Sequence, residues 1–231
     1  MTQSPTLVLV HGAWHGPWAW DRLVEELSDV DVRTVALPSV GADPAALGDL
    51  RADAAAVRSV VAGIDGPVLV CAHSYGGAPV TEGVADLPNV VGLVYLCAFQ
   101  LEIGDSLLSS VGGRPPEWWD VHEAEGYVDA LRPREIFYGD VDEAAADAAI
   151  AQLGHQSLAA LGQPLTRAAW HAVPSTYVIC EQDRAIPVFA QKAMAQRAKR
   201  VLRMSASHSP FLSHPAQLAG VLRAELAGLR G

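Results

Sequence analysis

Three residues in the 231-residue chain could together carry out nucleophilic acyl transfer: Ser74, Asp183 and His208. A serine hydroxyl is a weak nucleophile until a base takes its proton, and imidazole does this near neutral pH. The base needs a carboxylate on its other ring nitrogen, which fixes the tautomer and stabilises the imidazolium. These residues are therefore predicted to act as nucleophile, orienting acid and base, respectively.

Ser74 lies where an apolar run ends abruptly, in the stretch VLVCAHSYGG. A nucleophilic serine on a sharp strand-to-helix turn needs small residues two positions before and two positions after it. Gly76 meets this requirement, whereas Ala72 departs from the pattern G-x-S-x-G by one methyl group. An ordinary turn serine is the alternative. The small flanking residues and the available partners favour the nucleophile.

The acid and the base each have competitors. Asp183 could instead cap the helix that follows it, since aspartate is favoured at that position, and Asp105 is an alternative acid. His208 competes with His214, which directly precedes a proline at a helix start and is expected to be structural. It also competes with His155, which is expected to be a solvated loop residue.

Acyl transfer also needs hydrogen-bond donors where negative charge develops on the carbonyl oxygen. The backbone N–H of Tyr75 starts a helix and is therefore free to point at an oxyanion, and the N–H of Ala13 can supply the second donor. Gly12 allows the backbone to approach closely there. Three further histidines near this region are interpreted as scaffold: His11, His15 and His73.

Several aromatic residues could line an apolar substrate pocket or simply fill the core. The proposed substrate-binding residues are Trp14, Phe99 and Trp119, with Trp118 and Phe137 as further candidates. The sequence has no H-E-x-x-H pattern and no glycine-rich phosphate loop. Neither a metal site nor a cofactor is therefore expected.

Short β-rich runs alternate with longer amphipathic stretches, which predicts the elements that position these residues. The predicted strands are Thr6–Val10, Val32–Leu37, Val68–His73, Val90–Phe99, Ser175–Glu181 and Arg200–Ala206. The predicted helices are Trp18–Leu27, Leu47–Val61, Tyr75–Ala85, Val188–Arg197 and Pro215–Leu229. This order indicates an α/β protein with a parallel, doubly wound sheet of about six strands. Ligands bind such sheets beyond the carboxyl ends of the strands.

The interval 101–166 interrupts the alternation with turns rich in glycine and proline and with helical stretches. A connection of this length is usually functional. We expect a single domain over residues 1–231, in which residues 101–166 form a helical cap inserted after the fourth strand and act as a lid. A peripheral decoration is the alternative, and such a surface could equally mediate association into a homodimer.

Composition limits the partners and the compartment. Half of the residues are hydrophobic and the formal net charge is −10, so binding to nucleic acid or to a membrane surface is disfavoured. The three cysteines lie in apolar runs without a C-x-x-C spacing, which is typical of a reducing compartment. No signal peptide or spanning segment is apparent. A cytoplasmic location is predicted.

The chain resembles the α/β-hydrolase fold superfamily, and within it the branch of plant methylesterases, hydroxynitrile lyases and bacterial esterase-type relatives. The matching stretches are VLVHGAWHGPWAW, AHSYGG, DRAIP and SHSPFLSHP. The resemblance implies the same triad of Ser74, Asp183 and His208, with Ala13 and Tyr75 as the oxyanion hole.

Two positions separate lyases from esterases in this branch. The lyases carry threonine after the first-strand histidine and lysine after the catalytic histidine, where this chain has Gly12 and Ser209. Without that lysine there is no cation to stabilise departing cyanide. The expected activity is therefore hydrolysis of a small apolar carboxylic ester, with a lyase or a weakly hydrolytic small-molecule receptor as alternatives.

Overall fold

A six-stranded sheet forms the centre of the computed structural model, which describes residues 4–229. Its strand order is β10-β9-β5-β4-β1-β2, and every neighbouring pair is parallel. The strands are β1 (Thr6–Val10), β2 (Val32–Val35), β4 (Val68–His73), β5 (Val90–Leu96), β9 (Ser175–Cys180) and β10 (Arg200–Met204). The parallel, doubly wound sheet predicted from the sequence is confirmed.

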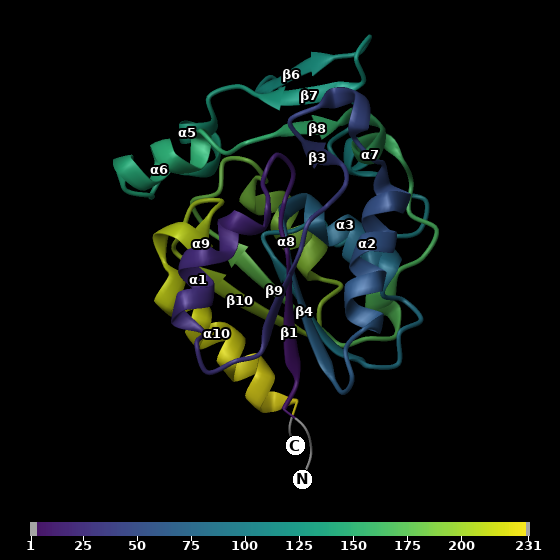
Figure 1. Cartoon of the computed structure of the whole chain (residues 1–231), viewed down its shortest axis with the longest axis vertical. Coiled ribbons are helices and arrows are strands. Elements are labelled where there is room, and N and C mark those ends of the chain that lie inside the picture. The colour runs from purple at the N-terminus through teal and green to yellow at the C-terminus, as the bar shows by residue number, and fades with distance from the viewer. Residues whose placement is uncertain (1–3, 230–231) are drawn as a thin grey trace.

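Helices cover both faces of this sheet. Figure 1 shows α1 (Asp21–Glu26) and α10 (Pro215–Gly228) on one face, and α2 (Leu50–Ala62) and α3 (Gly77–Gly83) on the other. Every residue of β1, β4 and β9 is consequently buried, which explains why these strands consist mainly of apolar residues and do not alternate with charged ones. The remaining helices outside the β5–β9 connection are α8 (Val188–Ala195), α9 (Pro210–Ser213) and the 3-10 helices η1 (Pro17–Trp20), η2 (Pro44–Ala46) and η3 (Ser74–Gly76).

The predicted boundaries differ from the observed ones by a few residues. The fourth predicted strand ran to Phe99, but β5 ends at Leu96 because Cys97 takes a left-handed conformation with φ of 35°, which breaks the extended backbone. The first predicted helix is split, since the 3-10 helix η1 precedes the short helix α1.

The segment between β5 and β9 is mixed rather than purely helical. It holds α4 (Leu107–Ser110), α5 (Pro133–Phe137), α6 (Glu143–Ile150), α7 (Leu158–Gly162), the 3-10 helix η4 (Ala169–His171) and the strands β6 (Trp119–His122), β7 (Tyr127–Ala130) and β8 (His155–Ser157). These strands form a second, antiparallel sheet with β3 (Val40–Gly41), in the order β3-β8-β7-β6.

The expectation of a helical cap over residues 101–166 missed a local alternation of buried and exposed residues. In β6 and β7, Trp119 and Val128 are buried while Asp120 is exposed, as a sheet with one covered face requires. Gly126, with φ of 77°, supplies the left-handed turn residue that joins the two strands. This sheet and α7 lie over the carboxyl ends of the central strands (Figure 1). Within residues 4–229, no helix has the length and apolar character needed to span a membrane.

Candidate active site

Ser74 occupies a strained turn between β4 and α3. Its φ is 53°, in the left-handed region that side chains other than glycine rarely adopt, and η3 begins at the same residue. A Cβ on Gly76 would lie 2.4 Å from the carbonyl oxygen of His11, so only glycine fits there. Ala72 lies in the buried strand between Val10 and Tyr95, where its methyl group is accommodated.

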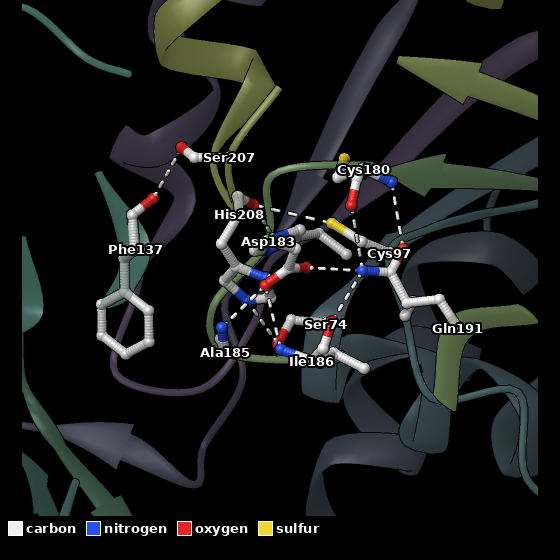
Figure 2. A network of polar contacts seen from close by, with 12 residues as sticks. Ser74, Cys97, Phe137, Cys180, Asp183, Ala185, Ile186, Gln191, Ser207 and His208 are labelled. Carbon is white, nitrogen blue, oxygen red and sulfur yellow. Dashed lines mark hydrogen bonds and ion pairs between the residues drawn. The ribbon is translucent and has the colours of Figure 1, made fainter. Parts of the chain in front are cut away.

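Three side chains from separate strand ends form one hydrogen-bonded line (Figure 2). The Nε2 atom of His208 lies 3.0 Å from the Oγ atom of Ser74. On the other side of the ring, Nδ1 lies 2.8 Å from the Oδ2 atom of Asp183. All three residues are buried. The structure thus brings together the three residues that the sequence analysis singled out.

The carboxylate of Asp183 is held in place by more than the histidine. Its Oδ1 atom accepts hydrogen bonds from the backbone N–H groups of Ala185 at 2.7 Å and Ile186 at 2.9 Å. Its Oδ2 atom also accepts one from the Nε2 atom of Gln191 at 3.0 Å. Asp183 therefore both caps the turn before α8 and faces His208.

Gln191 was not foreseen from the sequence. It is completely buried, and its amide also donates to the carbonyl of Ile186 at 2.8 Å and accepts from the N–H of Cys180 at 3.0 Å. The amide thereby ties the end of β9 to the loop that carries Asp183 (Figure 2). In the sequence it is one polar residue among others in a helical stretch, and nothing there marks it as buried.

His73 fixes the backbone of the proposed base. Its Nε2 atom lies 2.8 Å from the carbonyl oxygen of His208 and donates to it. Burial and the neighbouring His208 hold the pKa of His73 well below its ordinary value, so the ring is neutral. His73, Cys97 and His208 also form the one group of three potential metal ligands found among residues 4–229. Burial raises the pKa of the Cys97 thiol well above its ordinary value, and a protonated thiol is a poor metal ligand.

The loop after β1 approaches Ser74 closely. A Cβ on Gly12 would lie 2.8 Å from the Cβ of Ser74, which explains the glycine at this position. The backbone N–H of Ala13 has no hydrogen-bond acceptor among the described residues. The N–H of Tyr75 lies in the first turn of η3, where N–H groups have no acceptor within the helix.

Two neutral histidines hold this loop. The Nδ1 atom of His11 donates to the carbonyl of Gly12 at 2.8 Å, and its Nε2 atom accepts from the N–H of Leu37 at 3.1 Å. His15 donates from Nδ1 to the carbonyl of Ala13 at 2.8 Å, and its Nε2 atom lies 2.8 Å from the hydroxyl of Tyr138. Burial lowers the pKa of His11 to about 4 and that of His15 to about 3.

An apolar pocket opens beside Ser74 and His208. The three predicted substrate-binding residues Trp14, Phe99 and Trp119 all line it. Its other walls are Ala13, Tyr75, Leu107, Val111, Pro116, Trp118, Phe137, Leu161, Ala185 and Ile186. The segment between β5 and β9 supplies much of the wall, and the loops and turns that follow the central strands supply the rest.

The competing candidates lie elsewhere. Asp105 accepts a 3.4 Å hydrogen bond from the N–H of Glu102. The ring of His155 pairs with Asp129 at 2.7 Å. His214 pairs with a carboxylate on the loop before α6, Asp140, at 3.2 Å. None of the three has a hydrogen bond to Ser74, Asp183 or His208 among the described residues.

Comparisons with known proteins agree with this fold. Residues 7–221 match the alpha/beta hydrolase family. The chain is 32% identical over 242 residues to the alpha/beta hydrolase nvfD of Aspergillus novofumigatus, covering 95% of this chain and 96% of that protein. It is 24% identical to methylesterase 7 of Arabidopsis thaliana, covering 93% and 94%. The predicted resemblance to plant methylesterases is confirmed.

A solved structure shares the fold over almost the whole chain. It is that of a pyrethroid hydrolase from Sphingobium faniae, with a TM-score of 0.82 and 23% identity, covering 96% of this chain and 97% of that one.

Proposed function

Because the chain belongs to the alpha/beta hydrolase family, we propose that it is a serine hydrolase that cleaves carboxylic esters without a cofactor. The observation that carries this proposal is the hydrogen-bonded line from Ser74 through His208 to Asp183, beside an apolar pocket. The name of the methylesterase relative supports an ester as the substrate class.

In the first half of the proposed reaction, Ser74 Oγ attacks the ester carbonyl carbon while His208 Nε2 takes its proton. Asp183 stabilises the resulting imidazolium through Nδ1–H. The carbonyl oxygen becomes an oxyanion, which accepts hydrogen bonds from the N–H groups of Ala13 and Tyr75. When the tetrahedral intermediate collapses, the bond to the alcohol oxygen breaks and His208 protonates that oxygen.

In the second half, water hydrolyses the acyl-enzyme. His208 takes a proton from the water molecule while the water oxygen attacks the acyl carbon. The bond to Ser74 Oγ then breaks, the serine recovers its proton from His208, and the carboxylic acid leaves. The neutral histidines His11 and His15 keep the loop that carries Ala13 in one geometry throughout, since they hold its carbonyl groups.

The pocket supports an uncharged, apolar ester as substrate. Apart from Ser74 and His208, its lining side chains are apolar or aromatic, so a charged group there would lose its hydration without a partner. The segment 101–166 contributes Trp118, Trp119 and Val111 to the wall. We therefore propose that this segment is the lid of the site. The homodimer and the cytoplasmic location stay predictions.

Two positions speak against cyanohydrin cleavage. The site of the lyases' threonine is Gly12, where even a Cβ would lie 2.8 Å from Ser74. The site of their lysine is Ser209, which is completely buried at the start of α9. No cation stands beside His208 at either position.

Covalent labelling tests the proposal. A fluorophosphonate, in which serine oxygen displaces fluoride from phosphorus, is expected to add one phosphonyl group to the intact protein, located on Ser74 by peptide mass spectrometry. The Ser74→Ala variant should take up none. A receptor without hydrolytic chemistry would bind an apolar ligand and remain unlabelled, and that result would reject the proposal.

A further inference from the structure

A second, mostly apolar hollow lies directly beside the pocket over Ser74. It has a volume of about 350 Å³ and runs between the residues after β5 and helix α8, and its rim also includes the polar side chains of Asp105, Ser110 and Arg197. Phe99, Val111, Ala185 and Ile186 line both the hollow and the pocket. These four side chains are therefore the partition between the two spaces. We call the second hollow the α8 groove.

The inner pocket alone is too small for more than the reacting group. Its free volume is about 30 Å³, whereas a single water needs roughly 10–15 Å³ by the same measure. Sites that bury a small-molecule ligand usually have several hundred cubic ångströms. An ester with its carbonyl at Ser74 must therefore extend beyond this pocket.

The α8 groove offers apolar surface for that extension. Phe189, in the first turn of α8, lines it and is 77% exposed, the largest exposure among the large hydrophobic residues that the structure describes. Val111, on the partition, is 36% exposed and is followed by Gly112 and Gly113, both with positive φ and with free space around them. A ligand chain that crosses this partition into the groove would contact Phe189.

We propose that the α8 groove is a second subsite, which binds the apolar chain of an ester whose carbonyl lies at Ser74. The proposal rests on the proposed esterase function. The ligand class is an ester with an alkyl or aryl chain of about eight carbons, too long for the inner pocket, carried on either the acyl or the alcohol side. Each methylene buried in the groove should raise kcat/KM about twofold to fourfold, since one wall is open to water.

Substitutions in α8 test the subsite. Ala193 lines the groove on the exposed side of α8, so Ala193→Trp should fill it, and Phe189→Ala should remove its apolar wall without disturbing the core. Lys192→Trp, on the same helix and outside the groove, is the matched control. The substrates are p-nitrophenyl acetate and octanoate, which vary the acyl chain, and ethyl and octyl acetate, which vary the alcohol.

In one of the two series, Ala193→Trp is expected to lower kcat/KM for the eight-carbon ester at least tenfold, and Phe189→Ala at least threefold. Both should leave the short ester within twofold of the wild type, and Lys192→Trp should match the wild type throughout. The series that responds identifies the side of the ester that enters the groove. Equal effects on short and long esters, or none, would overturn the proposal.

A binding measurement separates this proposal from the proposed function. In the Ser74→Ala background, 1-octanol should bind by calorimetry, and Ala193→Trp should weaken that binding at least tenfold. If no ester is hydrolysed but octanol binds in this way, the esterase proposal fails and the subsite stands. If short esters are hydrolysed while octanol binding is absent or unaffected by Ala193→Trp, the subsite is rejected and the esterase proposal stands.

Discussion

The hydroxyl of Tyr75 donates a 2.6 Å hydrogen bond to the Oδ2 atom of Asp53. Asp53 is completely buried in α2, and its Oδ1 atom accepts from the N–H of Ser39 at 2.8 Å. The Oγ atom of Ser39 in turn accepts from the side chain of Gln156 at 3.1 Å. Tyr75, whose backbone N–H is proposed to bind the oxyanion, is thus anchored through its side chain to the buried carboxylate of Asp53.

Replacing Tyr75 should show how much its hydrogen bond to Asp53 contributes to the free energy of unfolding. Tyr75→Phe leaves the Asp53 carboxylate one donor short, so the free energy of unfolding at pH 7 should fall by about 1–3 kcal/mol. The control Tyr95→Phe loses only a neutral hydrogen bond to Thr81 and should cost about 1 kcal/mol. Urea unfolding of both variants measures the difference. A smaller loss for Tyr75→Phe than for Tyr95→Phe would contradict the anchor.

The same pair predicts a pH dependence. Burial raises the pKa of Asp53 above its ordinary value, so the folded state holds that proton more tightly than the unfolded chain. Stability from this group is therefore greatest at low pH and falls as pH rises from 3.8 through the folded pKa. The deficit of Tyr75→Phe, measured by urea unfolding, should shrink as pH falls, because the tyrosine hydroxyl stabilises the charged form of Asp53 and protonation removes that charge.

Removing the charge of Asp183 tests the orienting acid. Asp183→Asn keeps the shape but loses the acceptor that fixes the His208 tautomer, so kcat should fall about 10³- to 10⁴-fold. Asp105→Asn removes the rival carboxylate, which bonds only to the N–H of Glu102 among the described residues, and should leave kcat for p-nitrophenyl acetate within threefold. Comparable losses in the two variants would refute the assignment.

The buried histidines predict acid lability. The pKa of His11 is lowered to about 4 and that of His15 to about 3, both from 6.5. The stability due to their neutral forms is complete above pH 6.5 and is lost as pH falls towards the folded pKa, because the unfolded chain takes up the protons. Each contributes a slope of up to about 1.4 kcal/mol per pH unit. His15→Asn, measured by urea unfolding between pH 7 and pH 5, should reduce the slope by up to about 1.4 kcal/mol per pH unit, most strongly near pH 5; an unchanged slope would count against the buried neutral ring.

Substitutions at the two small residues that flank Ser74, Ala72 and Gly76, should differ in their effect on stability and activity. Gly76→Ala places a Cβ 2.4 Å from a backbone oxygen, so the turn that carries Ser74 must shift, with an expected cost above about 3 kcal/mol and loss of activity. Ala72→Gly restores the usual glycine at a strand position and should cost about 1 kcal/mol while kcat stays within threefold. Thermal unfolding and ester hydrolysis measure both. A tolerated Gly76→Ala would contradict the described packing.

The sequence allowed the central sheet and the three aligned side chains to be predicted because both depend on local signals. Apolar runs mark buried parallel strands, and the residues that end those strands meet at one edge of the sheet. Ser74 and Asp183 each follow such a run, whereas His208 follows the edge strand β10, most of whose residues are exposed. Their order along the chain, combined with chemical role, was sufficient to single them out.

The supporting contacts could not be predicted because they join residues distant in the sequence. Gln191 lies against Asp183, and Asp53 against Tyr75, yet a polar residue in a helix usually faces water. The second sheet was missed for a related reason. Strands such as β8 have three residues, and a pattern that short does not distinguish a strand from a turn.

The most direct test is the rate of p-nitrophenyl acetate and butyrate hydrolysis by purified protein, measured beside Ser74→Ala and the control Ser59→Ala, which removes an exposed hydroxyl from α2. We predict turnover in the wild type and in Ser59→Ala, and a loss of at least about 10³-fold in Ser74→Ala. Hydrolysis by Ser74→Ala at the wild-type rate would contradict the central claim that Ser74 is the nucleophile.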